Sequence, residues 1–198
     1  AFDPLSRTTR FMLTEEAHHM FVGETGVQRV VQRTCEVMKE VGSDPKDVRN
    51  AGAIDLPTIQ RYLNRWYSSS VDLFGGEKSS NAAMFFATGL KGRFMEDTKY
   101  EDHLCNEGVY ELPVCINDAL TVEEVALRNA MNEILRDQYV EDCEGPARRW
   151  NLVLEHNGRD ERLYLPNRRF NRRVGTYAEQ RFDIEGNPIS DHEWTANV

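Results

Sequence analysis

Two overlapping copies of the spacing Glu-x-x-His occur in the segment Thr14-Glu15-Glu16-Ala17-His18-His19-Met20-Phe21-Val22-Gly23. One copy pairs Glu15 with His18, and the other pairs Glu16 with His19. Residues three apart lie on one face of a helix, so each copy directs a carboxylate and an imidazole to the same side. Carboxylate-bridged di-iron and di-manganese bundles place such a pair on each of two core helices. The segment therefore predicts a metal-binding helix, against the alternative of an ordinary solvated helix face.

Apolar residues on both sides of the motif favour the metal over the solvated face. Acids and histidines inside an apolar helix must either face water or be satisfied internally, and a metal ion would satisfy them. Adjacent helical residues point about 100° apart, so only one of the two pairs can face the metal. We predict that this pair is Glu16 and His19. Their side of the helix also carries Leu13, Met20, Gly23 and Val27.

Longer strings of the sequence carry a resemblance to a known family. They are residues 15–24, 29–38, 73–77, 79–82, 89–93 and 193–197. These strings resemble the oxygenase component (component B) of benzoyl-coenzyme A (benzoyl-CoA) epoxidase, and the resemblance runs along nearly all 198 residues. The chain is much shorter than that component. We therefore expect it to be a central fragment, with sequence missing at both ends.

The resemblance implies a ferritin-like bundle that holds two iron ions bridged by carboxylates. Such a protein would bind dioxygen, take electrons from a separate reductase and add one oxygen atom across a ring bond of benzoyl-CoA. Carboxylate and imidazole ligands suit iron in this role because they leave coordination positions open. The sequence shows no flavin or nicotinamide signature, which fits an outside electron donor.

The resemblance also helps to predict the remaining metal ligands. Glu77 alone is typical of a solvated acid, and the matching residues around it favour a ligand instead. His103 falls where the bundle needs its second Glu-x-x-His, but Tyr100 occupies the position of the acid. Asp102 or Glu101 could reach the metal only from a distorted helix, and of the two we assign Asp102 to the ligand set. A complete site needs one more Glu from a further helix. Residues 1–15 leave no room for that helix.

The composition of the whole chain limits its class. A chain of 198 residues is long enough for one domain with a sizeable core. Its net charge of −9 disfavours wholesale binding of nucleic acid. No apolar run approaches the roughly 18 residues of a membrane span. The cysteines lack paired spacing and indicate free thiols in a reducing compartment, so we expect a soluble, cytoplasmic protein; they are Cys35, Cys105, Cys115 and Cys143.

Periodicity predicts a mainly helical chain. The first helix is expected over residues 6–41, and the second is expected after a capping residue at Asp55. Small residues in 68–76 interrupt good helix-forming sequence and predict a bend or a π-bulge there. A further helical stretch is expected from Glu77 onward.

The third quarter of the chain is expected to change from extended to helical structure. Residues 108–120 indicate one strand or a covering loop. Thr121 and Glu124 then match a capping box, which predicts a helix to about residue 143. Gly145-Pro146 is expected to end that helix.

The last quarter is rich in arginine. Nine arginines and four acids fall within residues 148–181, a local net charge of +5. Arginine suits bidentate contacts to phosphate, so Arg168 and Arg169 are predicted to bind phosphates of the CoA substrate. An interface with an acidic partner surface explains the charge equally well. Residues 181–190 indicate a hairpin, and we divide the chain into a helical part, 1–146, and a partly extended part, 147–198.

Three functions are compatible with these observations. The first is the di-iron oxygenase component. The second is a non-catalytic helical fragment that binds an acyl-CoA or a partner protein and lacks a complete metal site. The third, a hydrolytic zinc site, is disfavoured because the motif His-Glu-x-x-His is absent and the cysteine spacing is wrong for zinc.

Overall fold

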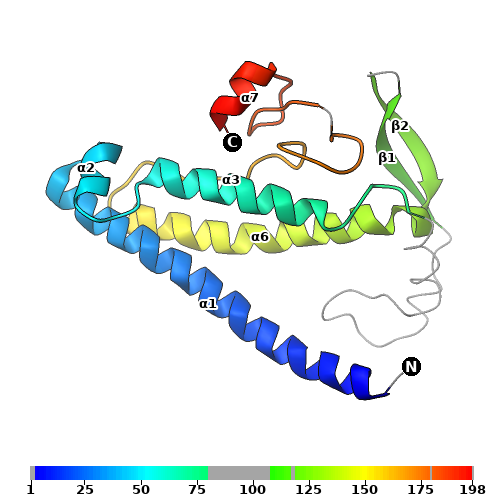
Figure 1. The fold of residues 1–198 in the computed structure, drawn as a ribbon, viewed down its shortest axis with the longest axis horizontal. Coiled ribbons are helices and arrows are strands. Elements are labelled where there is room, and N and C mark those ends of the chain that lie inside the picture. The colour runs from blue at the N-terminus through cyan, green and yellow to red at the C-terminus, as the bar shows by residue number, and fades with distance from the viewer. Residues whose placement is uncertain (1–2, 80–107, 117–118, 179, 198) are drawn as a thin grey trace. The chain divides into compact units, whose positions relative to one another are not determined.

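The computed structural model describes residues 3–79, 108–116, 119–178 and 180–197. Figure 1 labels its helices and strands. They are α1 (Asp3–Val41), α2 (Pro45–Asn50), α3 (Leu56–Asp72), β1 (Val109–Ile116), β2 (Ala119–Ala126), the 3₁₀ helix η1 (Leu127–Ala130), α6 (Met131–His156) and α7 (Asp191–Asn197). The prediction of a mainly helical chain is confirmed, and the ferritin-like arrangement stays a prediction. None of the described helices is both long and apolar enough to cross a bilayer.

The chain forms two compact units. Unit 1 contains residues 1–60 and 145–164, and unit 2 contains residues 61–144 and 165–198. The helices α3 and α6 each contribute residues to both units. The division predicted after residue 146 stays a prediction.

Unit 1 is built on α1, whose predicted helix over residues 6–41 is confirmed. Its second half buries apolar side chains such as Val31 and Cys35. The end of α6 runs beside it in the same direction, since the Trp150 ring nitrogen donates to the Glu24 carbonyl (3.1 Å) and Lys39 donates to the Asn157 side chain (2.7 Å). The chain leaves α1 through Gly42 at φ 88°, a left-handed conformation that costs glycine little.

Two aspartates cap the helices that follow α1. The Asp44 carboxylate accepts hydrogen bonds from the backbone of Lys46 and Asp47 at the start of α2. Asp55 accepts from the backbone N–H of Thr58 (3.0 Å) and from the Arg49 guanidinium (2.7 Å). The predicted cap at Asp55 is therefore confirmed, and the sequence signal succeeded because capping depends on local contacts.

The segment after α3 differs from the prediction. The helix ends at Asp72 instead of bending, Gly75 adopts φ 83°, and Glu77 lies in a non-helical segment. The Arg136 side chain donates to the carbonyls of Val71 and Gly75, so a side chain from α6 satisfies groups that a continued helix would have used. The rest of the predicted helix, from residue 80 onward, lies outside the described residues.

The capping box at Thr121 and Glu124 is wrong, because both residues lie in β2. This strand pairs antiparallel with β1, and Val114 lies opposite Thr121. The extended structure predicted for residues 108–120 is confirmed in β1. Pairing of the two strands also brings Leu112 and Val125 into a small buried cluster with Ala130, a tertiary gain that a local capping signal does not reveal.

Gly145-Pro146 does not end the helix, since α6 continues to His156 with Pro146 inside it. An interior proline removes one hydrogen bond and costs about 3 kcal/mol. The residues beyond it bury Ala147, Trp150 and Leu154 in unit 1. A large apolar side chain contributes about 1.5–3 kcal/mol when fully buried, so this packing offsets the cost of the proline.

The predicted hairpin over residues 181–190 is confirmed. Phe182 and Pro188 form a bridge, and the Ile189 N–H donates to the Arg181 carbonyl (3.0 Å). Gly186 makes the turn at φ 92°. The hairpin belongs to unit 2, in which the last part of the chain otherwise forms turns and loops up to α7.

Candidate functional site

The predicted ligands Glu16 and His19 lie together on α1. The Nδ1 atom of His19 is 3.4 Å from Oε2 of Glu16, and both side chains are more than 60% exposed. No such contact joins Glu15 to His18 in the part of the chain that the structure describes. Which of the two pairs faces a metal stays a prediction.

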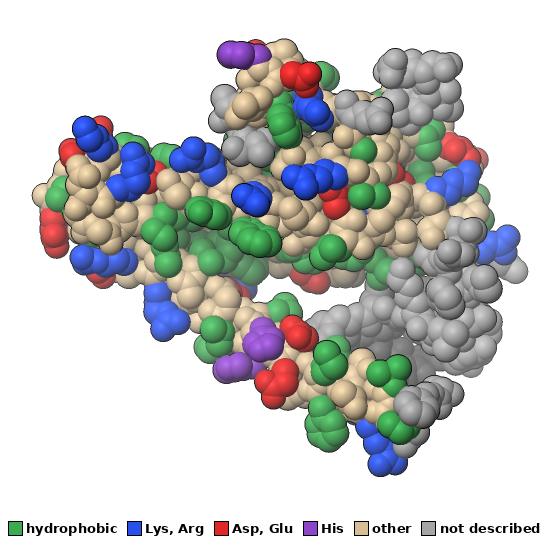
Figure 2. Space-filling view, in the orientation of Figure 1, with side chains coloured by type: hydrophobic (Ala, Val, Ile, Leu, Met, Phe, Trp, Pro, Cys, Tyr) green, Lys and Arg blue, Asp and Glu red, His purple; other side chains and the backbone are tan. Residues whose placement is uncertain are grey.

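Exposed apolar side chains surround this pair. Phe11, Met20 and Phe21 are each at least 65% exposed. Figure 2 shows imidazoles and carboxylates at the surface of α1 among apolar side chains. These three residues lie on different sides of α1, and a helix with apolar residues on several sides is typical of one that packs against others in a bundle.

Glu77 lies in unit 2 and is buried, with 5% of its surface exposed. Its Oε2 accepts from the Thr176 N–H (2.8 Å), whereas the buried Oε1 accepts no hydrogen bond in the described structure. Two guanidinium groups lie near Oε1, that of Arg172 at 3.7 Å and that of Arg136 at 3.9 Å. The Glu77 carboxylate is therefore held by positive charge.

Arg136 organises the charges around Glu77. Its guanidinium is completely buried and forms an ion pair with Glu133, one turn earlier on α6. It also donates to the Val71 carbonyl (3.2 Å) and to the Gly75 carbonyl. A buried guanidinium is stable only when its donors are satisfied, and here they fix the segment that carries Glu77.

Arg172 supports the same segment from the C-terminal part of unit 2. Its Nε atom donates to Asp72 at the end of α3 (2.5 Å), and its side chain is 1% exposed. The neighbouring Arg173 N–H donates to the other oxygen of Asp72 (2.9 Å). At least one arginine of the arginine-rich segment therefore forms an ion pair inside the protein and is not available to bind a ligand.

Arg168, predicted to contact substrate, forms ion pairs with Glu133 and Asp137. Asp137 also accepts a hydrogen bond from the Tyr110 hydroxyl (2.8 Å). Burial, followed by the hydrogen bond to Asp137, raises the pKa of Tyr110 to about 12, so the hydroxyl remains a donor at neutral pH. Arg168 is therefore tied to α6.

Arg169, the second predicted substrate contact, borders a cavity of about 390 Å³ in unit 2. Its guanidinium lies over the rings of Tyr177 and Phe182. Adjacent arginines thus have different surroundings: Arg168 is paired with acids, and Arg169 lies within cation–π distance of two aromatic rings. Asp102 and His103, the other predicted ligands, lie outside the described residues.

The donor chemistry fits iron best on α1. Glu16 and His19 offer an oxygen and a nitrogen donor together, and iron accepts both. Glu77 offers one buried oxygen without a hydrogen bond. However, a divalent cation at that oxygen would be repelled by the guanidinium groups of Arg136 and Arg172. Among the described residues, no three His, Cys, Asp or Glu side chains gather into a metal-binding group.

Sequence reasoning missed the buried polar face of α6. Asn132, Glu133 and Arg136 are all buried, whereas the apolar residues Ile134 and Leu135 are only partly buried. The spacing of Glu133 and Arg136, three residues apart, is a signal for an ion pair on one helix face. That signal does not reveal burial, because most such pairs lie in water.

No family model matches the chain. The chain is 49% identical over 196 residues, 98% of its length, to benzoyl-CoA oxygenase component B of Aromatoleum evansii. It spans 41% of the length of that relative. The resemblance predicted from the sequence is thereby confirmed.

Proposed function

We propose that this chain is part of a di-iron oxygenase component that epoxidises the ring of benzoyl-CoA. The similarity at 49% identity to a protein named benzoyl-CoA oxygenase component B carries this proposal. The Glu16–His19 pair on α1 supports it independently, because carboxylate-bridged di-iron bundles use the same spacing.

Five residues form the proposed ligand set: Glu16, His19, Glu77, Asp102 and His103. The exposed apolar side chains near Glu16 and His19 would, when covered by other helices, help to exclude water from the metal. To bind the metal, the Glu77 carboxylate would have to move away from the guanidinium groups of Arg136 and Arg172, and the metal would take their place as the neighbouring positive charge. Two iron ions, when bound, would supply the activation of dioxygen.

The proposal includes a separate reductase as the electron donor, as the resemblance to component B implies. The substrates are benzoyl-CoA and dioxygen, and the role of this chain's own residues is to bind and orient them. Neither nucleic acid nor a membrane surface is part of the proposal.

A labelling experiment tests this function. The intact protein is incubated with its reductase, benzoyl-CoA and isotopically labelled dioxygen, and the product is analysed by mass spectrometry. We expect one labelled oxygen atom in the ring of the acyl group. An unlabelled product, or an unchanged substrate with iron-loaded protein and active reductase, would contradict the proposal.

The second candidate is an acyl-CoA-binding or partner-binding fragment without catalysis. The two guanidinium groups beside the Glu77 carboxylate, which would repel a metal cation there, favour it. It predicts that the intact protein binds benzoyl-CoA but holds no iron.

A further inference from the structure

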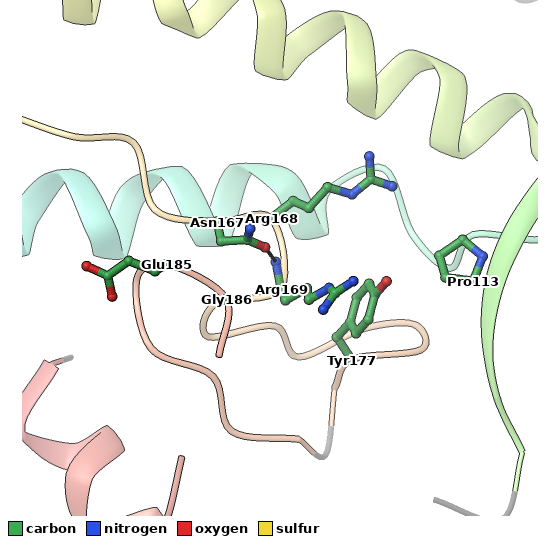
Figure 3. Close-up of a pocket in the computed structure, with 7 residues that line it drawn as sticks. All are labelled: Pro113, Asn167, Arg168, Arg169, Tyr177, Glu185 and Gly186. Atoms are coloured by element: carbon green, nitrogen blue, oxygen red, sulfur yellow. Dashed lines mark hydrogen bonds between the residues drawn. The ribbon is translucent and has the colours of Figure 1, made fainter. Parts of the chain in front are cut away.

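The cavity in unit 2 has walls from three separate segments. Figure 3 shows Pro113 of β1, Asn167 to Arg169 and Tyr177 of the C-terminal loops, and the hairpin turn at Glu185 and Gly186, where the Glu185 carboxylate points away from Arg169. Its volume of about 390 Å³ lies within the range of pockets that hold small ligands. The cavity therefore has room for a nucleotide-sized group.

The Arg169 guanidinium is held at this cavity by two aromatic rings. It lies 5.5 Å from the centre of the Tyr177 ring and 5.8 Å from that of Phe182. Both rings are about 2% exposed and meet edge to face. Cation–π attraction to the rings uses none of the N–H groups of the guanidinium as donors to an acid, so those groups remain able to donate to a ligand. No carboxylate pairs with Arg169 among the described residues.

Arg168 is oriented differently, although it also borders the cavity. Figure 3 shows its side chain directed toward α6 and away from Arg169. Its charge is neutralised by Glu133 and Asp137. The free positive charge of this pair of arginines therefore belongs to Arg169.

Asn167 and Gly186 fix the wall beside Arg169. The Asn167 N–H donates to the Ile184 carbonyl (2.7 Å), and its side-chain oxygen accepts from the Arg169 N–H (3.0 Å). A Cβ atom at Gly186 would lie only 2.6–2.9 Å from the Asn167 side chain. The hairpin thus packs so closely on Asn167 that only glycine fits, which preorganises the wall.

We infer that this cavity is an anion site in which Arg169 binds a phosphate group of the CoA nucleotide. The inference rests on the proposed function for the identity of the ligand. Arg169 donates in the plane of its guanidinium, a geometry suited to two phosphate oxygens. Arg168 is a positioning residue that ties the loop to α6 through its two ion pairs.

Calorimetric titration of the intact protein with CoA, with its isolated adenosine bisphosphate part and with pantetheine tests this site. Arg169→Gln should weaken the binding of CoA and of the nucleotide about tenfold or more, since hydrogen bonds to charged groups contribute about 1.5–3 kcal/mol. Arg173→Gln is the matched control, because Arg173 is an exposed neighbour outside the cavity. It should change the affinity less than about twofold.

Two further measurements keep the test decisive. Arg169→Lys keeps the charge but loses the planar pair of donors. Its affinity for the nucleotide should therefore lie between those of the unmodified protein and Arg169→Gln. In the unmodified protein, the nucleotide should protect Arg169 from an arginine-specific reagent, as read by peptide mass spectrometry. This protection does not depend on the folding of any variant.

The outcomes separate the site from the function. Unchanged nucleotide affinity in Arg169→Gln, or no protection of Arg169, would overturn the inference. If the protein still bound CoA in that case, the proposed function would remain. Equal affinity for nucleotide and pantetheine would also overturn it. If the intact protein binds neither CoA nor benzoyl-CoA, the proposed function fails as well.

Discussion

The two oxygens of the buried Glu77 carboxylate have different surroundings. One oxygen accepts a backbone hydrogen bond, and the other has guanidinium neighbours but no hydrogen bond. A buried acceptor that lacks a partner costs about 1–3 kcal/mol. Nearby positive charge reduces that cost, which explains why Arg136 and Arg172 are themselves buried beside it.

A substitution at Gly175 tests how closely the chain packs against the Glu77 carboxylate. It has φ 85°, and a Cβ atom there would lie only 2.7 Å from the carboxyl carbon of Glu77. Gly175→Ala should lower the free energy of unfolding by about 1–3 kcal/mol from overpacking, in addition to the backbone strain. Urea denaturation measures the loss.

Gly158→Ala is the control for that measurement. Gly158 also has a positive φ, of 71°, but a Cβ atom at this position would meet no other atom within 4 Å. It should lose only the strain of a left-handed alanine, about 1–2 kcal/mol. Equal losses in the two variants would show that the Glu77 carboxylate does not approach Gly175.

The choice of Glu16 over Glu15 is a second prediction for single residues. In the intact protein, Glu16→Ala and His19→Ala should each lose iron, because each removes a proposed ligand. Glu15→Ala is the matched control and should keep most of the iron, at a cost in affinity of about 10- to 100-fold at most. Two irons retained in Glu16→Ala, with loss in Glu15→Ala, would show that the other pair faces the metal.

The elements of this protein show which sequence signals suffice. The helix α1, the cap at Asp55 and the hairpin turning at Gly186 were predictable, since each depends on residues a few positions apart. The strand β2 was not, because its capping-box pattern is compatible with a strand once β1 lies beside it. The continuation of α6 past Pro146 likewise depends on packing in unit 1.

Asp55 provides a prediction for the element it caps. Asp55→Ala should lower the free energy of unfolding by about 1–2 kcal/mol at neutral pH, because α3 loses its N-cap and the contact with Arg49. Asp47→Ala, which removes an exposed acid that caps nothing, should cost less. Denaturation with urea compares the three proteins.

The effect of Asp55 should depend on pH. Burial opposes ionisation, but hydrogen bonds from Arg49 and Thr58 outweigh it and lower the pKa of Asp55 below its ordinary value of 3.8. A depressed folded-state pKa stabilises the protein above pH 3.8, and this contribution is lost as the pH falls through the folded-state pKa. The difference between Asp55→Ala and the unmodified protein should therefore shrink at strongly acidic pH. A constant difference would contradict the assigned contacts.

At the scale of the whole molecule, the two units use different interiors. Unit 1 buries mainly apolar residues, whereas unit 2 buries Glu77, Glu133, Arg136 and Arg172 beside its apolar cluster. Replacing one member of such a buried pair typically costs about 3–5 kcal/mol, since its partner is left uncompensated. Removal of a single buried charge should therefore lower the stability of unit 2 more than that of unit 1.

The candidate site was predictable to a different degree in each unit. The donor pair on α1 follows from a spacing of three residues within one helix. The partners of Glu77, in contrast, are Arg136 and Arg172, which lie far from it in the sequence and meet it only through the fold of unit 2. The sequence comparison found a relative of 49% identity, but the surroundings of these charges required the structure.

Metal analysis of the freshly purified, intact protein tests the proposed di-iron centre most directly. Iron is quantified per chain after extensive dialysis and again after reconstitution with ferrous iron. The proposed function predicts two iron ions per chain, lost together in His19→Ala. Intact, folded protein that holds no iron under either condition would contradict it.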